Sequence, residues 1–122
     1  MNLYRELIID LYKNPVNKRS MPDAHITNSG ANVTCGDRVR IYIKKDSEKI
    51  TDLSFEGEGC AISIAAASLL TEEAKGVLLN DISDWGPHNI FEWLGTELGP
   101  ARIKCGLLAL ETLQEAVKKI KQ

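Results

Sequence analysis

Three cysteines, Cys35, Cys60 and Cys105, are the residues of this 122-residue chain best suited to chemistry. They are odd in number and far apart in the sequence, which argues against a disulfide framework and leaves core packing, metal binding or thiol chemistry. Taken alone, each cysteine fits a small buried hydrophobic residue. Each also has a glycine beside it, however, which lets the backbone approach a shared centre closely.

Three thiolates form an incomplete tetrahedral set, and Asp37 is the natural fourth ligand. Cys35 and Asp37 are two positions apart, so both side chains project to the same side of an extended segment. Such a site suits zinc, or an iron–sulfur cluster held loosely by one hard oxygen ligand. Structural zinc sites usually use closely spaced cysteine pairs, so the spacing leaves a second interpretation open, in which Asp37 caps its own turn.

Each cysteine falls at a boundary between expected elements. Cys35 lies in a turn over residues 32–37, Cys60 begins an alanine-rich helix, and Cys105 lies in the first turn of the last helix. The N-terminus of a helix favours a thiolate over a thiol, and the nearby cations Arg102 and Lys104 act in the same direction. The sequence surroundings of both Cys60 and Cys105 therefore favour the thiolate form over the thiol.

The elements that must position these residues are mostly strands first and helices afterwards, which indicates one α+β domain over residues 1–122. Alternation of apolar and polar residues predicts an antiparallel hairpin whose second strand buries Leu53 and Phe55 and exposes Asp52, Ser54 and Glu56. We expect a helix over Leu3–Lys13, a loop over 16–23, a weak strand over Ala24–Asn28, hairpin strands over Arg38–Lys44 and Lys49–Glu56, a helix over Ala61–Lys75, short helices on either side of Gly86-Pro87, and a final helix over Ala101–Lys121.

Composition excludes several classes of function. The chain is 43% hydrophobic and 26% charged, the balance of a globular domain, and its net charge of −2 does not favour nucleic acid as a partner. The longest segments without a charged residue, Ala24–Gly36 and Gly59–Thr71, fall short of the roughly 20 apolar residues that a membrane-spanning helix needs. Charged residues near the start replace the apolar core of a signal peptide, so we expect a cytoplasmic protein without a membrane partner.

Each cysteine belongs to a distinct short motif. The three motifs are Cys35-Gly36-Asp37-Arg38, Phe55-Glu56-Gly57-Glu58-Gly59-Cys60-Ala61-Ile62-Ser63 and Arg102-Ile103-Lys104-Cys105. In this order they resemble the U-type iron–sulfur cluster assembly scaffolds, the family of IscU, SufU and the N-terminal part of NifU. Asn14-Pro15-Val16-Asn17 also resembles that family's early Asn-Pro-Arg-Asn segment. The similarity is greatest to the SufU branch, in the second motif and the last.

The resemblance implies a small antiparallel three-stranded sheet covered by helices. It implies Cys35, Asp37, Cys60 and Cys105 as ligands of zinc, of iron or of a transient 2Fe–2S cluster, with the three cysteines as candidate acceptors of persulfide sulfur. The implied partners are a cysteine desulfurase, which delivers the sulfur, and apo iron–sulfur proteins, which receive the cluster. A scaffold of this kind, a monomer or weak dimer, is not an enzyme in the sense of turnover.

Two departures separate the chain from the IscU branch, and one separates it from the SufU branch. IscU-type members carry His before the last cysteine, where this chain has Lys104, and a charged lysine has no lone pair for a metal. Their Leu-Pro-Pro-Val-Lys segment, which a chaperone grips, reads Leu98-Gly99-Pro100-Ala101-Arg102 here. The insertion typical of SufU between the second and third cysteines is missing. Two other functions therefore stay open: a zinc-dependent sulfurtransferase that activates a desulfurase, and a structural zinc domain.

Overall fold

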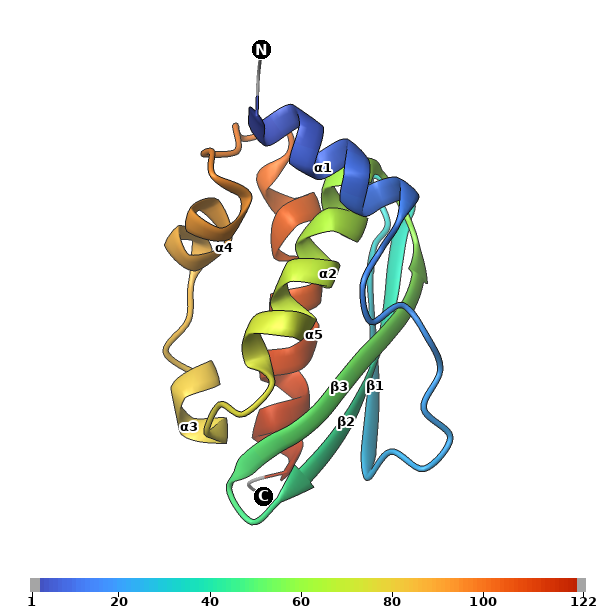
Figure 1. Cartoon of the computed structure of the whole chain (residues 1–122), viewed down its shortest axis with the longest axis vertical. Coiled ribbons are helices and arrows are strands. Elements are labelled where there is room, and N and C mark those ends of the chain that lie inside the picture. Colours follow the sequence, from blue (N-terminus) through green and yellow to red (C-terminus); the bar gives the residue numbers. More distant parts are fainter. Residues whose placement is uncertain (1–2, 121–122) are drawn as a thin grey trace.

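The computed structural model describes residues 3–120, which form one three-stranded sheet and five helices (Figure 1). The strands lie in the order β1-β2-β3 and both neighbouring pairs are antiparallel. The α+β class and the three-stranded sheet expected from the sequence are thus confirmed. The elements are α1 (Leu3–Lys13), β1 (Ile26–Asn32), β2 (Asp37–Asp46), β3 (Lys49–Glu58), α2 (Ala61–Ala74), α3 (Leu79–Ile82), α4 (Pro87–Leu94) and α5 (Ile103–Ile120).

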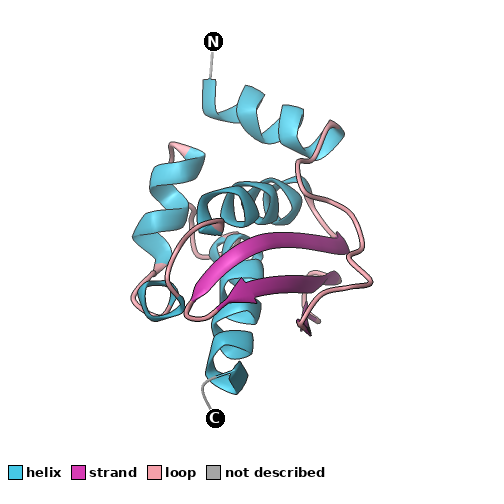
Figure 2. Cartoon of the chain, turned by 60° about the horizontal axis from the view of Figure 1, so that its bottom comes forward, coloured by secondary structure: helices cyan, strands magenta, loops and turns pink. Residues whose placement is uncertain are grey.

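The core lies between one face of the sheet and the helices α2 and α5, which pack against it (Figure 2). Phe55 and Leu53 of β3 and Leu113 of α5 are fully buried in this layer, and each such side chain stabilises the fold by about 1.5–3 kcal/mol. Helix α2 also contacts α1 and α4, so it is enclosed on most sides. That enclosure explains why its sequence is apolar all round rather than amphipathic.

The opposite face of the sheet differs from the expectation. Ser54, predicted to face solvent, is fully buried, and its cross-strand partner Tyr42 is 8% exposed. The segment between α1 and β1 lies over this face, where Met21 is 3% exposed and Arg19 forms an ion pair with Asp52. The prediction for Ser54 was wrong because alternation along a strand says nothing about a loop that returns to cover its polar face.

The boundaries of other elements differ little from those expected. The weak strand runs over Ile26–Asn32 rather than Ala24–Asn28, and the final helix begins at Ile103. Lys121, the expected end of that helix, lies outside the described residues. In the described part of the chain, each helix is too short or too polar to cross a membrane.

Candidate metal centre

Three element ends meet at one edge of the molecule because of how the sheet is paired. The β1–β2 turn closes at the pair Asn32↔Asp37, and the backbone N–H groups of Cys35 and Gly36 both donate to the Asn32 carbonyl. Gly36 has a φ of 73°, a left-handed conformation that glycine adopts without strain. Cys35 therefore sits at the tip of a tight turn, directly before the strand that carries Asp37.

Pairing between β2 and β3 brings the second cysteine to the same edge. Arg38 pairs with Glu58 at the end of the ladder, so the Gly59-Cys60 segment that follows β3 lies next to Asp37. The backbone N–H of Cys60 donates to Asp37 Oδ1 at 3.0 Å. Cys60 is the N-cap residue of α2, and its side chain makes no cap hydrogen bond. The carboxylate from β2 instead satisfies the backbone N–H of Cys60 itself.

The third cysteine completes a tight group of possible ligand atoms. The Sγ atoms of Cys35 and Cys105 and a carboxylate oxygen of Asp37 all lie within 4.8 Å of one another. The two Sγ atoms are 3.6 Å apart, although the residues are 70 positions apart in sequence. Two thiolates bound to one tetrahedral zinc ion would lie about 3.8 Å apart, given zinc–sulfur bonds of about 2.3 Å. The spacing therefore fits a shared metal ion.

Cys60 lies beside this group rather than inside it. Its side chain is half-buried, and its thiol is close enough to Cys105 to affect that residue's pKa. The structure thus places the four residues expected from the sequence at one edge, with the closest approach among Cys35, Asp37 and Cys105. Ligation of a metal by all four stays a prediction.

Asp37 provides the test of whether this site suits a cation. The residue is 1% exposed, and its Oδ2 atom has no hydrogen-bond partner among the described residues. Burying a carboxylate with an unsatisfied oxygen is costly unless a cation compensates it. A soft sulfur pair and a buried, unpaired oxygen form a donor set that fits zinc or iron.

The three thiols differ in accessibility, and this corrects one expectation. Cys35 is exposed, whereas Cys105 is 3% exposed. Burial raises the pKa of the Cys105 thiol, and the neighbouring Asp37, Cys35 and Cys60 side chains raise it further. The predicted thiolate at Cys105 is therefore wrong for the metal-free protein, because the desolvation of a charged sulfur outweighs the exposed cation next to it in sequence. Metal binding there must displace a proton.

A protein-family match and the sequences of similar proteins point to the same family. Residues 3–122 match the NifU-like N-terminal domain. The zinc-dependent sulfurtransferase SufU of Bacillus subtilis is 37% identical to this chain, with 96% of this chain and 90% of the relative covered. The iron–sulfur cluster assembly scaffold protein IscU of Thermotoga maritima is 34% identical, with 97% and 94% covered.

Solved structures of SufU and NifU-like proteins share the fold of this chain. A crystal structure of a SufU protein of the SUF system from Fervidobacterium islandicum has a TM-score of 0.77 and 31% identity to this chain, covering 92% of this chain and 94% of that one. A NifU-like protein from Brucella abortus, at 17% identity, shares the fold with a TM-score of 0.78. The resemblance carried by the three cysteine motifs is confirmed, and the chain belongs to the NifU-like N-terminal domain family, the group that contains IscU and SufU.

Proposed function

We propose that this protein is an iron–sulfur cluster assembly scaffold. It accepts persulfide sulfur from a cysteine desulfurase and transiently holds iron, a 2Fe–2S cluster or zinc through Cys35, Asp37, Cys60 and Cys105. The observation that carries the proposal is the close group formed by the Cys35 and Cys105 sulfurs and a carboxylate oxygen of Asp37. The same buried carboxylate keeps its Oδ2 atom without a hydrogen-bond partner among the described residues. One hard ligand among thiolates binds an iron–sulfur cluster weakly, because the irons favour thiolate, and weak binding suits cargo that must leave.

The exposed thiol is the natural entry point for sulfur. Cys35 is exposed at the tip of the β1–β2 turn, so a partner's persulfide can reach it, whereas Cys105 is buried. In the transfer, the Cys35 thiolate attacks the outer sulfur of the desulfurase persulfide. The sulfur–sulfur bond of that persulfide breaks, and the desulfurase cysteine leaves as a thiolate. Cys35 then carries the persulfide next to the remaining ligands.

The second candidate is a zinc-dependent sulfurtransferase that activates the desulfurase and builds no cluster. It is favoured by the 37% identity to a protein of that name from Bacillus subtilis. The third, a structural zinc domain, has less support. The apolar core extends through the sheet, α2 and α5, so the fold does not depend on the metal in the way that a small zinc finger does.

Anaerobic reconstitution separates these functions. Parent protein is incubated with ferrous iron, cysteine and a catalytic amount of desulfurase, and the visible absorbance of the re-isolated protein is recorded. A scaffold gains a cluster chromophore and passes it to an apo-ferredoxin. A sulfurtransferase keeps its zinc, stimulates the desulfurase and stays colourless. Failure of both readouts would leave only the structural role and would overturn the proposal.

A further inference from the structure

The two carboxylate oxygens of Asp37 have different environments. Oδ1 accepts the Cys60 N–H at 3.0 Å, while Oδ2 is buried without a hydrogen-bond partner among the described residues. One oxygen of this carboxylate lies within 4.8 Å of the Cys35 and Cys105 sulfurs. We propose that Cys60 N–H holds Asp37 as a one-oxygen ligand, and that Gly59 is the positioning residue that leaves room for this arrangement. The inference rests on the proposed metal site, which it deepens.

The backbone at Gly59 lies so close to neighbouring side chains that there is no room for a Cβ atom. A Cβ atom built at this position would lie 2.5 Å from Asp37 Oδ1, 3.0 Å from Asp37 Cγ and 2.4 Å from Ser63 Oγ. Gly59 is not among the glycines with positive φ, so its backbone would accept another residue. Glycine is needed here for space, and the space it leaves is occupied by a candidate metal ligand.

The two crowded neighbours differ in how easily they can move. The Ser63 hydroxyl makes one long hydrogen bond, 3.3 Å to the Cys60 carbonyl, and can rotate away from a new methyl group. The Asp37 carboxylate is 1% exposed, and displacing Oδ1 breaks its bond to the Cys60 N–H. Because both oxygens belong to one rigid carboxylate, a shift of Oδ1 also moves Oδ2. An alanine at position 59 therefore acts on the ligand.

The other glycines do not share this property. At Gly57 a Cβ would strike the Arg38 backbone carbonyl at 2.3 Å, and at Gly106 it would strike a methyl group of Leu98. At Gly99 no atom of the described residues lies within 4 Å of such a Cβ. Gly59 alone among the glycines has a candidate ligand as its close neighbour, and Gly99, in the loop before α5, offers a matched glycine-to-alanine control.

This arrangement has a chemical consequence. The backbone N–H engages one lone pair of Oδ1, which leaves Oδ2 as the oxygen of this carboxylate that makes no hydrogen bond to the described residues and is free to bind a metal. A one-oxygen carboxylate is an easily exchanged ligand, and the backbone bond fixes the carboxylate when the metal has left. The site is therefore preorganised to rebind cargo as well as to release it.

The test measures zinc affinity, by competition with a chromophoric chelator, for Gly59→Ala, Ser63→Ala, their double variant and Gly99→Ala. Substitution of a group that orients a metal ligand typically costs about 10- to 100-fold in affinity. We expect a loss of that size for Gly59→Ala, no rescue in the double variant, and parent-like affinity for Ser63→Ala and Gly99→Ala. Cobalt substitution adds a spectroscopic readout: the thiolate-to-cobalt band should persist while the ligand-field bands shift.

A thermodynamic cycle with Asp37→Ala separates positioning from a general structural effect. If Gly59 acts through Asp37, adding Gly59→Ala to Asp37→Ala lowers zinc affinity no further. Parent-like affinity in Gly59→Ala, or an equal loss with and without Asp37, would overturn the inference. Should Gly59→Ala fail to fold, Asp37→Asn replaces it: an amide oxygen can still cap Cys60, so thermal stability should hold while affinity falls. A protein that binds zinc as described yet forms no cluster would overturn the proposed function alone.

Discussion

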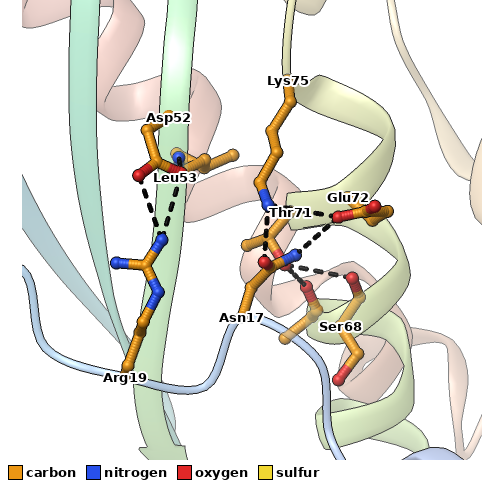
Figure 3. Close-up of polar contacts among 9 residues, drawn as sticks. Asn17, Arg19, Asp52, Leu53, Ser68, Thr71, Glu72 and Lys75 are labelled. Carbon is orange, nitrogen blue, oxygen red and sulfur yellow. Dashed lines mark hydrogen bonds and ion pairs between the residues drawn. The ribbon is translucent and has the colours of Figure 1, made fainter.

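Asn17, in the loop after α1, allows a prediction whose size follows from the contacts. Its side-chain amide donates to Thr71 Oγ1 at 3.2 Å and to Glu72 Oε1 at 3.1 Å, and its Oδ1 accepts from Lys75 Nζ at 2.7 Å (Figure 3). Its backbone carbonyl accepts the N–H of Phe55, and its φ is 61°. One residue thus ties the loop to both α2 and β3.

The expected cost of Asn17→Ala has two parts. The side-chain hydrogen bonds contribute about 1–2 kcal/mol together, since Glu72 is exposed and Thr71 keeps its own bonds to the helix backbone. The left-handed backbone costs alanine about 1 kcal/mol more than asparagine or glycine. We expect Asn17→Ala to lower the free energy of unfolding by about 2–3 kcal/mol, and Asn17→Gly by about 1–2 kcal/mol.

Thermal and urea unfolding of the metal-free protein measure both effects. At about 4 °C per kcal/mol, Asn17→Ala should melt about 8–12 °C below the parent. The control is Asn14→Ala, because the Asn14 side chain is exposed in the same motif. A parent-like melting temperature for Asn17→Ala would refute the stabilising role of the Asn17 hydrogen bonds. A larger drop in melting temperature for Asn17→Gly than for Asn17→Ala would refute the role of the left-handed backbone.

Three further predictions concern the site. Lys104→Ala should retain metal, measured by elemental analysis, because Lys104 is exposed and has no lone pair when charged; loss of metal with an intact fold would contradict this. Asp37→Cys should slow transfer of a reconstituted cluster to an apo-ferredoxin, followed by absorbance, because thiolate binds iron more firmly than carboxylate; equal or faster transfer would oppose the account. Removal of metal by a chelator should preserve the far-ultraviolet circular dichroism, since the apolar core extends through the sheet, α2 and α5; unfolding would favour a structural zinc domain.

Local patterns were sufficient for most of the fold. Alternation along β3 predicted the buried Leu53 and Phe55, and helical spacing predicted the final helix, which buries Leu113 in the structure. These predictions succeeded because each pattern reflects one element against one core. Ser54 failed because its burial depends on a loop from elsewhere in the chain, which no pattern within the strand records.

The sequence indicated which candidate ligands come close together, but it did not indicate how deeply each of them is buried. The motifs placed Cys35, Cys60 and Cys105 at element ends, and the sheet register brings those ends together. The expectation of a thiolate at Cys105 was wrong, because neighbouring residues in the sequence reveal nearby charges but not the burial that raises the pKa of this thiol. The hydrogen bond from the Cys60 N–H to Asp37 could not be predicted from the sequence either, because strand pairing brings these two distant residues together. The only sequence feature connected with it is the glycine before Cys60.

X-ray absorption at the metal edge of protein purified without oxygen measures the ligand set of the proposed site. We expect one zinc or iron site per chain whose ligands are three sulfur atoms, from Cys35, Cys60 and Cys105, and one oxygen, from Asp37. For zinc the sulfur distance should be about 2.3 Å. The Cys60→Ser variant should lose one sulfur or the metal itself. A first shell without sulfur, or an unchanged shell in Cys60→Ser, would contradict the account.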